Sequence, residues 1–446
     1  MIVRGKSADS SGRPDERTSP RDGPDGVLDL RDATTSPAPA RKRGARVARM
    51  LGPAFVAAIA YVDPGNVATN LTAGATLGCT LVWVVVAASL VAILVQFQAA
   101  KLGMATGESL PRLCRGRFTR LASLMLWSQA EMVVLATDLA EFVGAAIGMH
   151  LLFRMPVAAS AVATAVVSLA LLELRRKGRT RPFELMSAAA LLLVGAGIGY
   201  DIIVTGHQSR SALAAGLVPG LGAEGAPLLA MGIVGATVMP HAVYLHSALV
   251  QGRGMTTAAA RRQPDLVRRI LRVDCSLALG VATVVNVSMI ALGAGLGAAT
   301  GGAWTGDLPA AHAELAARAG GAAALAFAVA LMASGISSSG IGTLAGDVVM
   351  RGFLGRRVPV HVRRVLTMTP AVLALFSGVS LTGLLVLSQV VISLGVPVAL
   401  FLLVHFCRDK SLMGPLVNAP YTTWIAGAAA VVVALLGCSL PILLLW

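Results

Sequence analysis

Long apolar stretches separated by short polar connections run through most of the chain. Each stretch is long enough, at about 20 residues, to cross the hydrocarbon core of a bilayer as a helix. Eleven candidate spans are found, near residues 50–77, 80–101, 121–150, 156–174, 183–205, 226–250, 270–298, 321–349, 365–379, 382–406 and 422–445. Almost nothing separates the ninth span from the tenth at Gly378, so hydropathy alone leaves a count that differs by one open. The pattern predicts an all-α membrane protein.

The amino-acid composition supports this class. Hydrophobic residues make up 56% of the 446 residues, charged residues only 13%, and the mean hydropathy is +0.75. A soluble globular protein carries about 25% charged residues, so a soluble enzyme is nearly excluded. The net charge is +15, and in a membrane protein the excess of basic residues is expected in cytoplasmic loops rather than at a nucleic-acid surface. Five scattered cysteines without a CxxC motif predict free thiols.

The first 40 residues are rich in Asp, Arg, Ser, Pro and Gly, and they lead into a basic cluster at 41–49. Residues 1–48 are predicted to form a disordered cytoplasmic tail, followed by a transporter domain at 49–446. With the N-terminus inside, the inside loops and the basic cluster hold 28 Lys and Arg, and the outside loops hold three. This asymmetry predicts eleven spans in the cell membrane, with a cytoplasmic N-terminus and an extracellular C-terminus.

Most carboxylates lie in loops or near span ends, but four lie deeper within the predicted spans, where an unpaired charge costs several kcal/mol. Asp63 lies near the middle of the first span. Glu131, Asp138 and Glu141 lie in the third, and their spacings of seven and three residues put them on one helix face. Such a row of acids indicates a proton or cation route. The alternative is a set of structural hydrogen bonds between helices.

The first span is interrupted at Asp63-Pro64-Gly65-Asn66. Proline and glycine stop the helix and free backbone carbonyls. Unwound backbone at membrane depth is tolerated only where it lines a cavity or is buried in protein. A carboxylate and an amide flank this break, and both carry oxygen atoms that bind cations. The break therefore predicts a cation site.

The sixth span has a matching interruption at Met239-Pro240-His241. Interrupted spans at equivalent positions in two halves indicate a transporter binding site. Spans one to five and spans six to ten form two halves of five spans each. Because five is an odd number, the second half enters the membrane from the side opposite to the first, which makes the two halves an inverted repeat. Met239 occupies the place that Asp63 has in the first half. His241 and His246 could titrate near physiological pH.

With these motifs, the sequence resembles the Nramp family of divalent-metal/proton symporters, of the bacterial manganese-transporter type. The resemblance covers residues 50 to about 445. It rests on three motifs, Asp63-Pro64-Gly65-Asn66, Ala236-Thr237-Val238-Met239-Pro240-His241 and Ala136-Thr137-Asp138-Leu139-Ala140-Glu141. It implies a LeuT-like fold with repeats at 49–206 and 225–406 and an extra helix at 421–446. It also implies import of Mn²⁺ or Fe²⁺, and also Cd²⁺, coupled to protons, with the metal as cargo and no cofactor.

The resemblance also implies roles for individual residues. The implied metal ligands are the side chains of Asp63, Asn66 and Met239, the backbone carbonyls of Ala60 and Ala236, and Gln389 when the site is occluded. The implied proton network contains His241, Glu131, Asp138 and Glu141 and continues to Arg363 and Arg364. His246 is added to this proton pathway because of its place after the second break. The expected partners are metal ions, protons and the bilayer, with no nucleic acid.

The ligand chemistry favours a transition metal. Oxygen ligands alone would suit Mg²⁺ or Ca²⁺, whereas a thioether binds softer metals better. One alternative is a symporter of the same fold for amino acids or another organic substrate, although Asp63 would repel a substrate carboxylate. An intramembrane aspartyl protease is a second alternative. It is disfavoured because Asp201 falls at the outer end of the fifth span and Asp347 at the inner end of the eighth, and that chemistry needs two carboxylates in one site.

Overall fold

The computed structural model describes residues 52–175, 180–206, 209–251, 255–304, 306–356 and 358–443. The predicted tail at 1–48 and its basic cluster lie outside this part of the chain. Every regular element among the described residues is a helix, as the hydropathy pattern predicts.

Each of the eleven predicted spans corresponds to one helix, or to a pair of half-helices, in the described part of the chain. They are α2 (Pro53–Ala60) with α3 (Pro64–Leu77), α4 (Val82–Thr106), α6 (Arg120–Phe153), α7 (Val157–Arg175), α8 (Thr180–Thr205), α10 (Ala226–Thr237) with α11 (Pro240–Leu249), α13 (Pro264–Ala299), α15 (Gly321–Val349), α16 (Val360–Phe376), α17 (Leu381–Cys407) and α19 (Pro420–Leu443). Eight candidate spans satisfy length and hydropathy by themselves. The others are the divided first span, α7 and the 17-residue α16.

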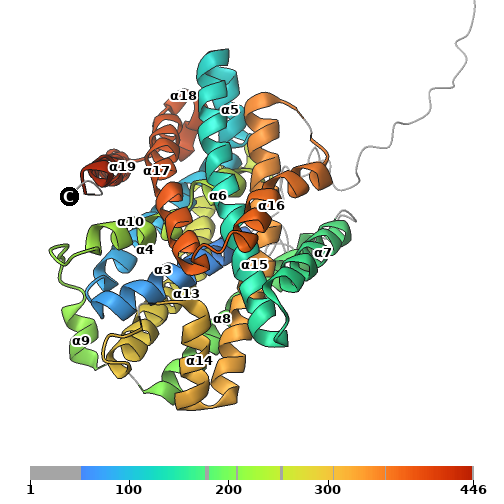
Figure 1. Cartoon of the computed structure of the whole chain (residues 1–446). Helices are drawn as coiled ribbons and strands as arrows, with labels where there is room; N and C mark the ends of the chain where they lie inside the picture. The colour runs from blue at the N-terminus through green and yellow to red at the C-terminus, as the bar shows by residue number, and fades with distance from the viewer. Residues whose placement is uncertain are drawn as a thin grey trace, which may run out of the picture. The chain divides into compact units, whose positions relative to one another are not determined.

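Short helices lie in the connections between the spans. They are α5 (Leu110–Arg117), α9 (Arg210–Ala215), α12 (Thr257–Arg262), α14 (Leu308–Ala319) and α18 (Lys410–Met413), with the turns η2 (Met350–Leu354) and η3 (Gly414–Leu416). Figure 1 shows α5 and α18 at one end of the bundle and α9 and α14 at the other. This placement is expected if successive spans alternate in direction, because α5 and α18 follow even-numbered spans and α9 and α14 follow odd-numbered spans. The ninth and tenth spans are separate, because the chain turns at Gly378, whose φ of 73° favours glycine.

Several helices extend beyond the apolar stretches that predicted them. α13 begins at Pro264 instead of 270, and η2 carries the eighth span on to Leu354. α16 begins five residues before the predicted 365 and ends three before 379. Hydropathy marks only the part of a helix that lies in hydrocarbon, whereas helical hydrogen bonding continues into polar sequence. Proline at the first position of α13 starts that helix without the loss of a bond.

Close packing of small residues holds the central helices together. α15 packs against α6 and α8, α13 against α3, and α10 against α17. A β-carbon on Gly148 of α6 or Gly335 of α15 would lie 2.6 Å from backbone of the opposite helix. Such close approach is typical of membrane helices, where dispersion and small residues replace the hydrophobic effect. The outer helices expose apolar side chains instead, and Trp424 of α19 is 78% exposed.

The contact between α10 and α17 gives a stability test. We expect Gly235→Ala to lower the midpoint of thermal unfolding, because its β-carbon would lie 1.9 Å from the carbonyl oxygen of Gln389, and overpacking costs about 1–3 kcal/mol. Gly280→Ala in α13 is the matched control, since no described atom lies within 4 Å of its β-carbon. Equal midpoints for the two purified variants would contradict this close approach.

Candidate functional site

The first break is produced by the Asp63–Pro64 step. In a continuous helix, the amide of residue 64 would donate to the carbonyl of Ala60, but proline has no N–H. α2 therefore ends at Ala60, and Asp63 takes the extended conformation that precedes proline, with φ −75° and ψ 168°. The Asp63 side chain caps α3, because its Oδ1 accepts a hydrogen bond from the backbone N–H of Asn66 at 2.8 Å.

The second break repeats this geometry with different chemistry. Pro240 removes the donor for the carbonyl of Ala236, and Met239 before it is extended, with φ −73° and ψ 115°. Met239 makes no capping hydrogen bond to α11, because a thioether is a poor acceptor. Its fully buried side chain is therefore not tied to the first turn of α11.

Asn66 joins the two breaks. Its Nδ2 donates to Oδ1 of Asp63 at 2.7 Å and to the carbonyl oxygen of Ala236 at 2.8 Å. Two oxygen atoms from the two breaks thus meet around one partially positive NH₂ group. The other end of the amide, Oδ1, is buried without a hydrogen-bond partner among the described residues. Rotation of the amide by about 180° would turn this oxygen toward the same two oxygens, an arrangement that only a cation stabilises.

Gln389 of α17 completes this group. Its Nε2 lies 3.5 Å from Oδ2 of Asp63, and its Oε1 is buried without a partner among the described residues. A β-carbon on Gly65 would lie 1.7 Å from this Nε2, and one on Gly235 would lie 1.9 Å from the Gln389 carbonyl oxygen. One glycine beside each break therefore makes room for Gln389.

Two side chains that sequence analysis did not single out bind the remaining carbonyls of the first break. Asn286 of α13 donates to the Tyr61 carbonyl at 2.9 Å, and Ser334 of α15 donates to the Val62 carbonyl at 2.5 Å. These bonds satisfy buried backbone that has left the helix. An amide in the apolar seventh span was a usable signal for Asn286. Serine gives no such signal, because it is common in membrane helices, where it bonds to its own helix.

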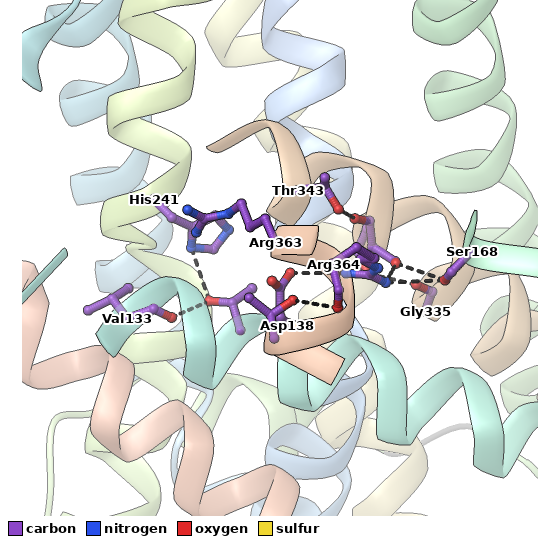
Figure 2. Close-up of polar contacts among 12 residues, drawn as sticks. Val133, Asp138, Ser168, His241, Gly335, Thr343, Arg363 and Arg364 are labelled. Atoms are coloured by element: carbon purple, nitrogen blue, oxygen red, sulfur yellow. Dashed lines mark hydrogen bonds and ion pairs between the residues drawn. The ribbon is translucent and has the colours of Figure 1, made fainter. Parts of the chain in front are cut away.

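The first two acids of α6 pair with arginines of α16. Glu131 makes a two-pronged ion pair with Arg363, with Nη2–Oε1 2.7 Å and Nη1–Oε2 3.3 Å. Asp138 pairs with Arg364 at 3.3 Å. Arg364 also donates to Ser168 of α7 at 3.1 Å and to Ser339 of α15. Figure 2 shows the Arg364 guanidinium between Asp138 and Ser168, so this buried cation joins four helices.

Glu141, the third acid, has no arginine bound to it. Both of its oxygens are buried, with the hydroxyl of Ser338 in α15 beside them. Oε2 of Glu141 and Oδ1 of Asp138 each lie 2.6 Å from the position that a β-carbon on Gly342 would take. The two carboxyl groups are therefore neighbours, and both approach α15 at Gly342, which has no side chain. One turn further along α6, a β-carbon on Gly144 would lie 1.9 Å from the side chain of Pro64, so Glu141 lies along this helix between the first break and the paired acids.

The two histidines after the second break lie in different clusters. His241 Nδ1 lies 3.2 Å from the hydroxyl of Thr137, whose proton is directed to the Val133 carbonyl at 2.9 Å (Figure 2). The histidine must then donate to Thr137, the neighbour of Asp138 in the chain. His246 instead contacts Oε1 of Gln96 in α4 at 2.8 Å.

Gln96 in turn donates to the Tyr61 hydroxyl at the first break. The structure thus brings His241 to the acid-bearing helix and His246 to α4. The described residues contain no group of three or more His, Cys, Asp and Glu suited to a metal. A cation site at the breaks depends on carbonyl, amide and thioether donors around the single carboxylate of Asp63.

Comparison with known proteins identifies relatives over nearly the whole chain. The family model described as "Natural resistance-associated macrophage protein-like", Nramp, matches residues 54–443. A divalent metal cation transporter, MntH, from Deinococcus radiodurans is 44% identical over 422 residues, which are 94% of this chain and 95% of the relative.

Solved structures show the same architecture. A manganese transporter of Eremococcus coleocola superposes with a TM-score of 0.79 at 28% identity, over 92% of this chain and 90% of that one. Mhp1, a nucleobase-cation-symport-1 family transporter, superposes with a TM-score of 0.59 at 15% identity, over 87% and 89% of the two chains. The second likeness concerns the fold alone.

Proposed function

The chain belongs to the Nramp family, and on this premise we propose that it imports divalent transition-metal ions, Mn²⁺ or Fe²⁺ and also Cd²⁺, by alternating access coupled to protons. It is a multi-pass membrane protein with the predicted LeuT-like inverted repeat and broken first and sixth spans. The proposed orientation keeps the N-terminus in the cytoplasm and the C-terminus outside the cell, as the loop charges predict.

The meeting of the two breaks at Asn66 carries the proposal. Its amide NH₂ lies between an oxygen of Asp63 and the carbonyl of Ala236, where a metal ion would lie after the amide turns. The proposed ligands are Asp63, Asn66, Met239 and Gln389 with the carbonyls of Ala60 and Ala236. Six donors of this kind suit an octahedral ion such as Mn²⁺.

The Met239 sulfur supports selection against hard ions. Mg²⁺ and Ca²⁺ prefer oxygen ligands only, and they lose hydration that a thioether does not replace. Only one ligand, Asp63, carries a negative charge, so a bound divalent ion leaves the site positive. This argues against an organic substrate with a carboxylate as the physiological cargo, because Asp63 would repel it.

The row of acids supports proton coupling. A metal charge at the breaks favours loss of a proton from a nearby carboxyl group. Glu141 lies along α6 between the contact of Gly144 with Pro64 and its neighbour Asp138 at Gly342. In the proposed route, a proton leaves through Asp138 and Glu131 toward Arg363 and Arg364. His241 joins this route through Thr137, whereas His246 lies beside Gln96.

We expect Asp63→Asn to lower metal uptake by about 100-fold or more, since loss even of a group that supports a ligand costs 10–100-fold. The change keeps the size of the side chain and one oxygen ligand but removes the charge. Uptake of Mn²⁺ by vesicles that contain equal amounts of folded protein is the measurement. Asp265→Asn, an exposed acid of α13, is the control and should transport normally. Near-normal uptake by Asp63→Asn would refute the assignment of the metal site to Asp63.

Met239→Ala is expected to reduce the preference for Cd²⁺ over Ca²⁺ by about tenfold, which corresponds to about 1.4 kcal/mol of discrimination. The mutant keeps the oxygen ligands and loses the only soft one, so Cd²⁺ should lose more affinity than Mn²⁺. Competition between metals within one variant is measured, because lower expression scales all metals alike. Met231→Ala of α10 leaves a similar core cavity and should keep the wild-type preference. Unchanged selectivity in Met239→Ala would make Met239 a packing residue.

Asp138→Asn should impair proton influx while Mn²⁺ affinity stays within about threefold of the wild-type value, because α6 contributes no proposed ligand. The readouts are acidification inside vesicles and Mn²⁺ binding to the purified protein. Removal of one partner of a buried pair also costs about 3–5 kcal/mol, so folded protein is quantified first. Asp347→Asn, which breaks a partly exposed pair with Arg351, is the control. Lost affinity with normal proton influx would refute the proposed role.

A further inference from the structure

The candidate site is closed to solvent on every side. Asp63, Asn66, Met239 and Gln389 are each 0% exposed. A cargo ion bound among them cannot leave unless an element of the bundle moves. On the proposed cytoplasmic side, the site is covered by α2, which runs from Gly52 to the carbonyl of Ala60 beside the first break.

The geometry of α2 allows it to move as a unit. It has only eight residues, and non-helical backbone bounds each end. Gly52 has φ 126°, a region that side chains rarely adopt, and Tyr61–Asp63 is unwound. The neighbours of α2 are α8, α11, α13 and α15. The bonds between α2 and these neighbours therefore decide whether the site is covered.

The start of α2 is bonded to a carboxylate of another span. Oδ1 of Asp274 in α13 accepts from the Gly52 N–H at 3.0 Å, and Oδ2 accepts from the Ala54 N–H at 3.1 Å. Gly52 has no side chain with which to cap the helix, and Pro53 has no N–H. The next two amides, of Phe55 and Val56, both donate to the Gly52 carbonyl. Asp274 thus binds the two donors that the sequence of α2 leaves without a local acceptor.

We propose that Asp274 is a latch that holds α2 over the metal site, and that its release opens the site toward the cytoplasm. The carboxylate lies at the positive end of the α2 dipole, where an anion is stabilised, and it is 1% exposed. α3 differs, because it is capped by its own Asp63. A cap from another span breaks when α2 moves, whereas a cap from within the same segment would move with it. This inference rests on the proposed transport function, which gives the movement its purpose.

Asp274→Asn tests the latch with little change in shape. An amide accepts with its oxygen only, so its NH₂ group faces one of the two N–H donors and that bond is lost. Because the helix start loses one of its two capping bonds, we expect the open fraction to rise about threefold to tenfold, which corresponds to about 0.6–1.4 kcal/mol. Cys275 reports this opening, since it adjoins Asp274 in the chain and is fully buried.

The experiment measures how fast a membrane-impermeant maleimide labels each cysteine of the full-length protein in inside-out vesicles. Labelled peptides are quantified by mass spectrometry. Cys275 should react about threefold to tenfold faster in Asp274→Asn than in the wild type. Cys114 and Cys407, which are equally buried but distant in sequence from α2, should react at the wild-type rate. Asp265→Asn, on the exposed side of α13, is the matched control and should leave all rates unchanged.

Asp274→Glu keeps the carboxylate, so it should return Cys275 labelling toward the wild-type rate. Unchanged labelling of Cys275 in Asp274→Asn would overturn the latch. An equal rise at Cys114 and Cys407 would also overturn it, because it would show general loosening of the fold. The assay contains no metal. A wild-type protein that failed to transport metal would therefore refute the proposed function without altering the labelling result.

Discussion

A backbone carbonyl inside a bilayer must find a donor within the protein, because no water is available to supply one. Pro64 and Pro240 each withhold the donor that a helix would have provided, and the centre of the molecule is arranged around the carbonyls that result. Asn286 and Ser334 bind two of them, and Asn66 binds that of Ala236. The candidate site is thus the place where two helices were interrupted and their exposed backbone was brought together.

The buried acids around this centre differ in whether they bind an arginine. Asp63 is the one carboxylate at the breaks, Glu141 lies beyond it without an arginine, and the two acids farther along α6 each bind one. An incoming divalent ion would act on the two carboxyl groups that bind no arginine, whereas each of the other two is neutralised by its own arginine. The Thr137–His241 contact joins the second break to the same helix. Metal and proton are thereby proposed to act on one connected group of residues.

Most of the fold could be predicted from sequence, because hydropathy, loop charge and two interrupted spans are strong local signals. The positions of Asp63 and Met239 just before the prolines indicated equivalent breaks without knowledge of contacts. Tertiary partners could not be predicted in this way. Nothing local shows that Asp274 caps a helix about 220 residues earlier in the chain, or that His246 contacts Gln96. Helix ends were also missed at α13 and α16, where hydrogen bonding outlasts the apolar stretch.

The amide of Asn66 has a consequence for the transport cycle as a whole. A carrier that delivers cargo must also return without it, and an empty site lined by oxygen atoms resists closure through mutual repulsion. Here the NH₂ group of Asn66 lies between an oxygen of Asp63 and the carbonyl oxygen of Ala236 and binds both. The Asn66 side chain would offer its NH₂ group to the two oxygens when the carrier returns without cargo. It would offer its own oxygen as a ligand when the metal is bound. A half-turn of this one amide would then decide whether the site favours a cation, while movement of α2 decides whether the cation can enter or leave.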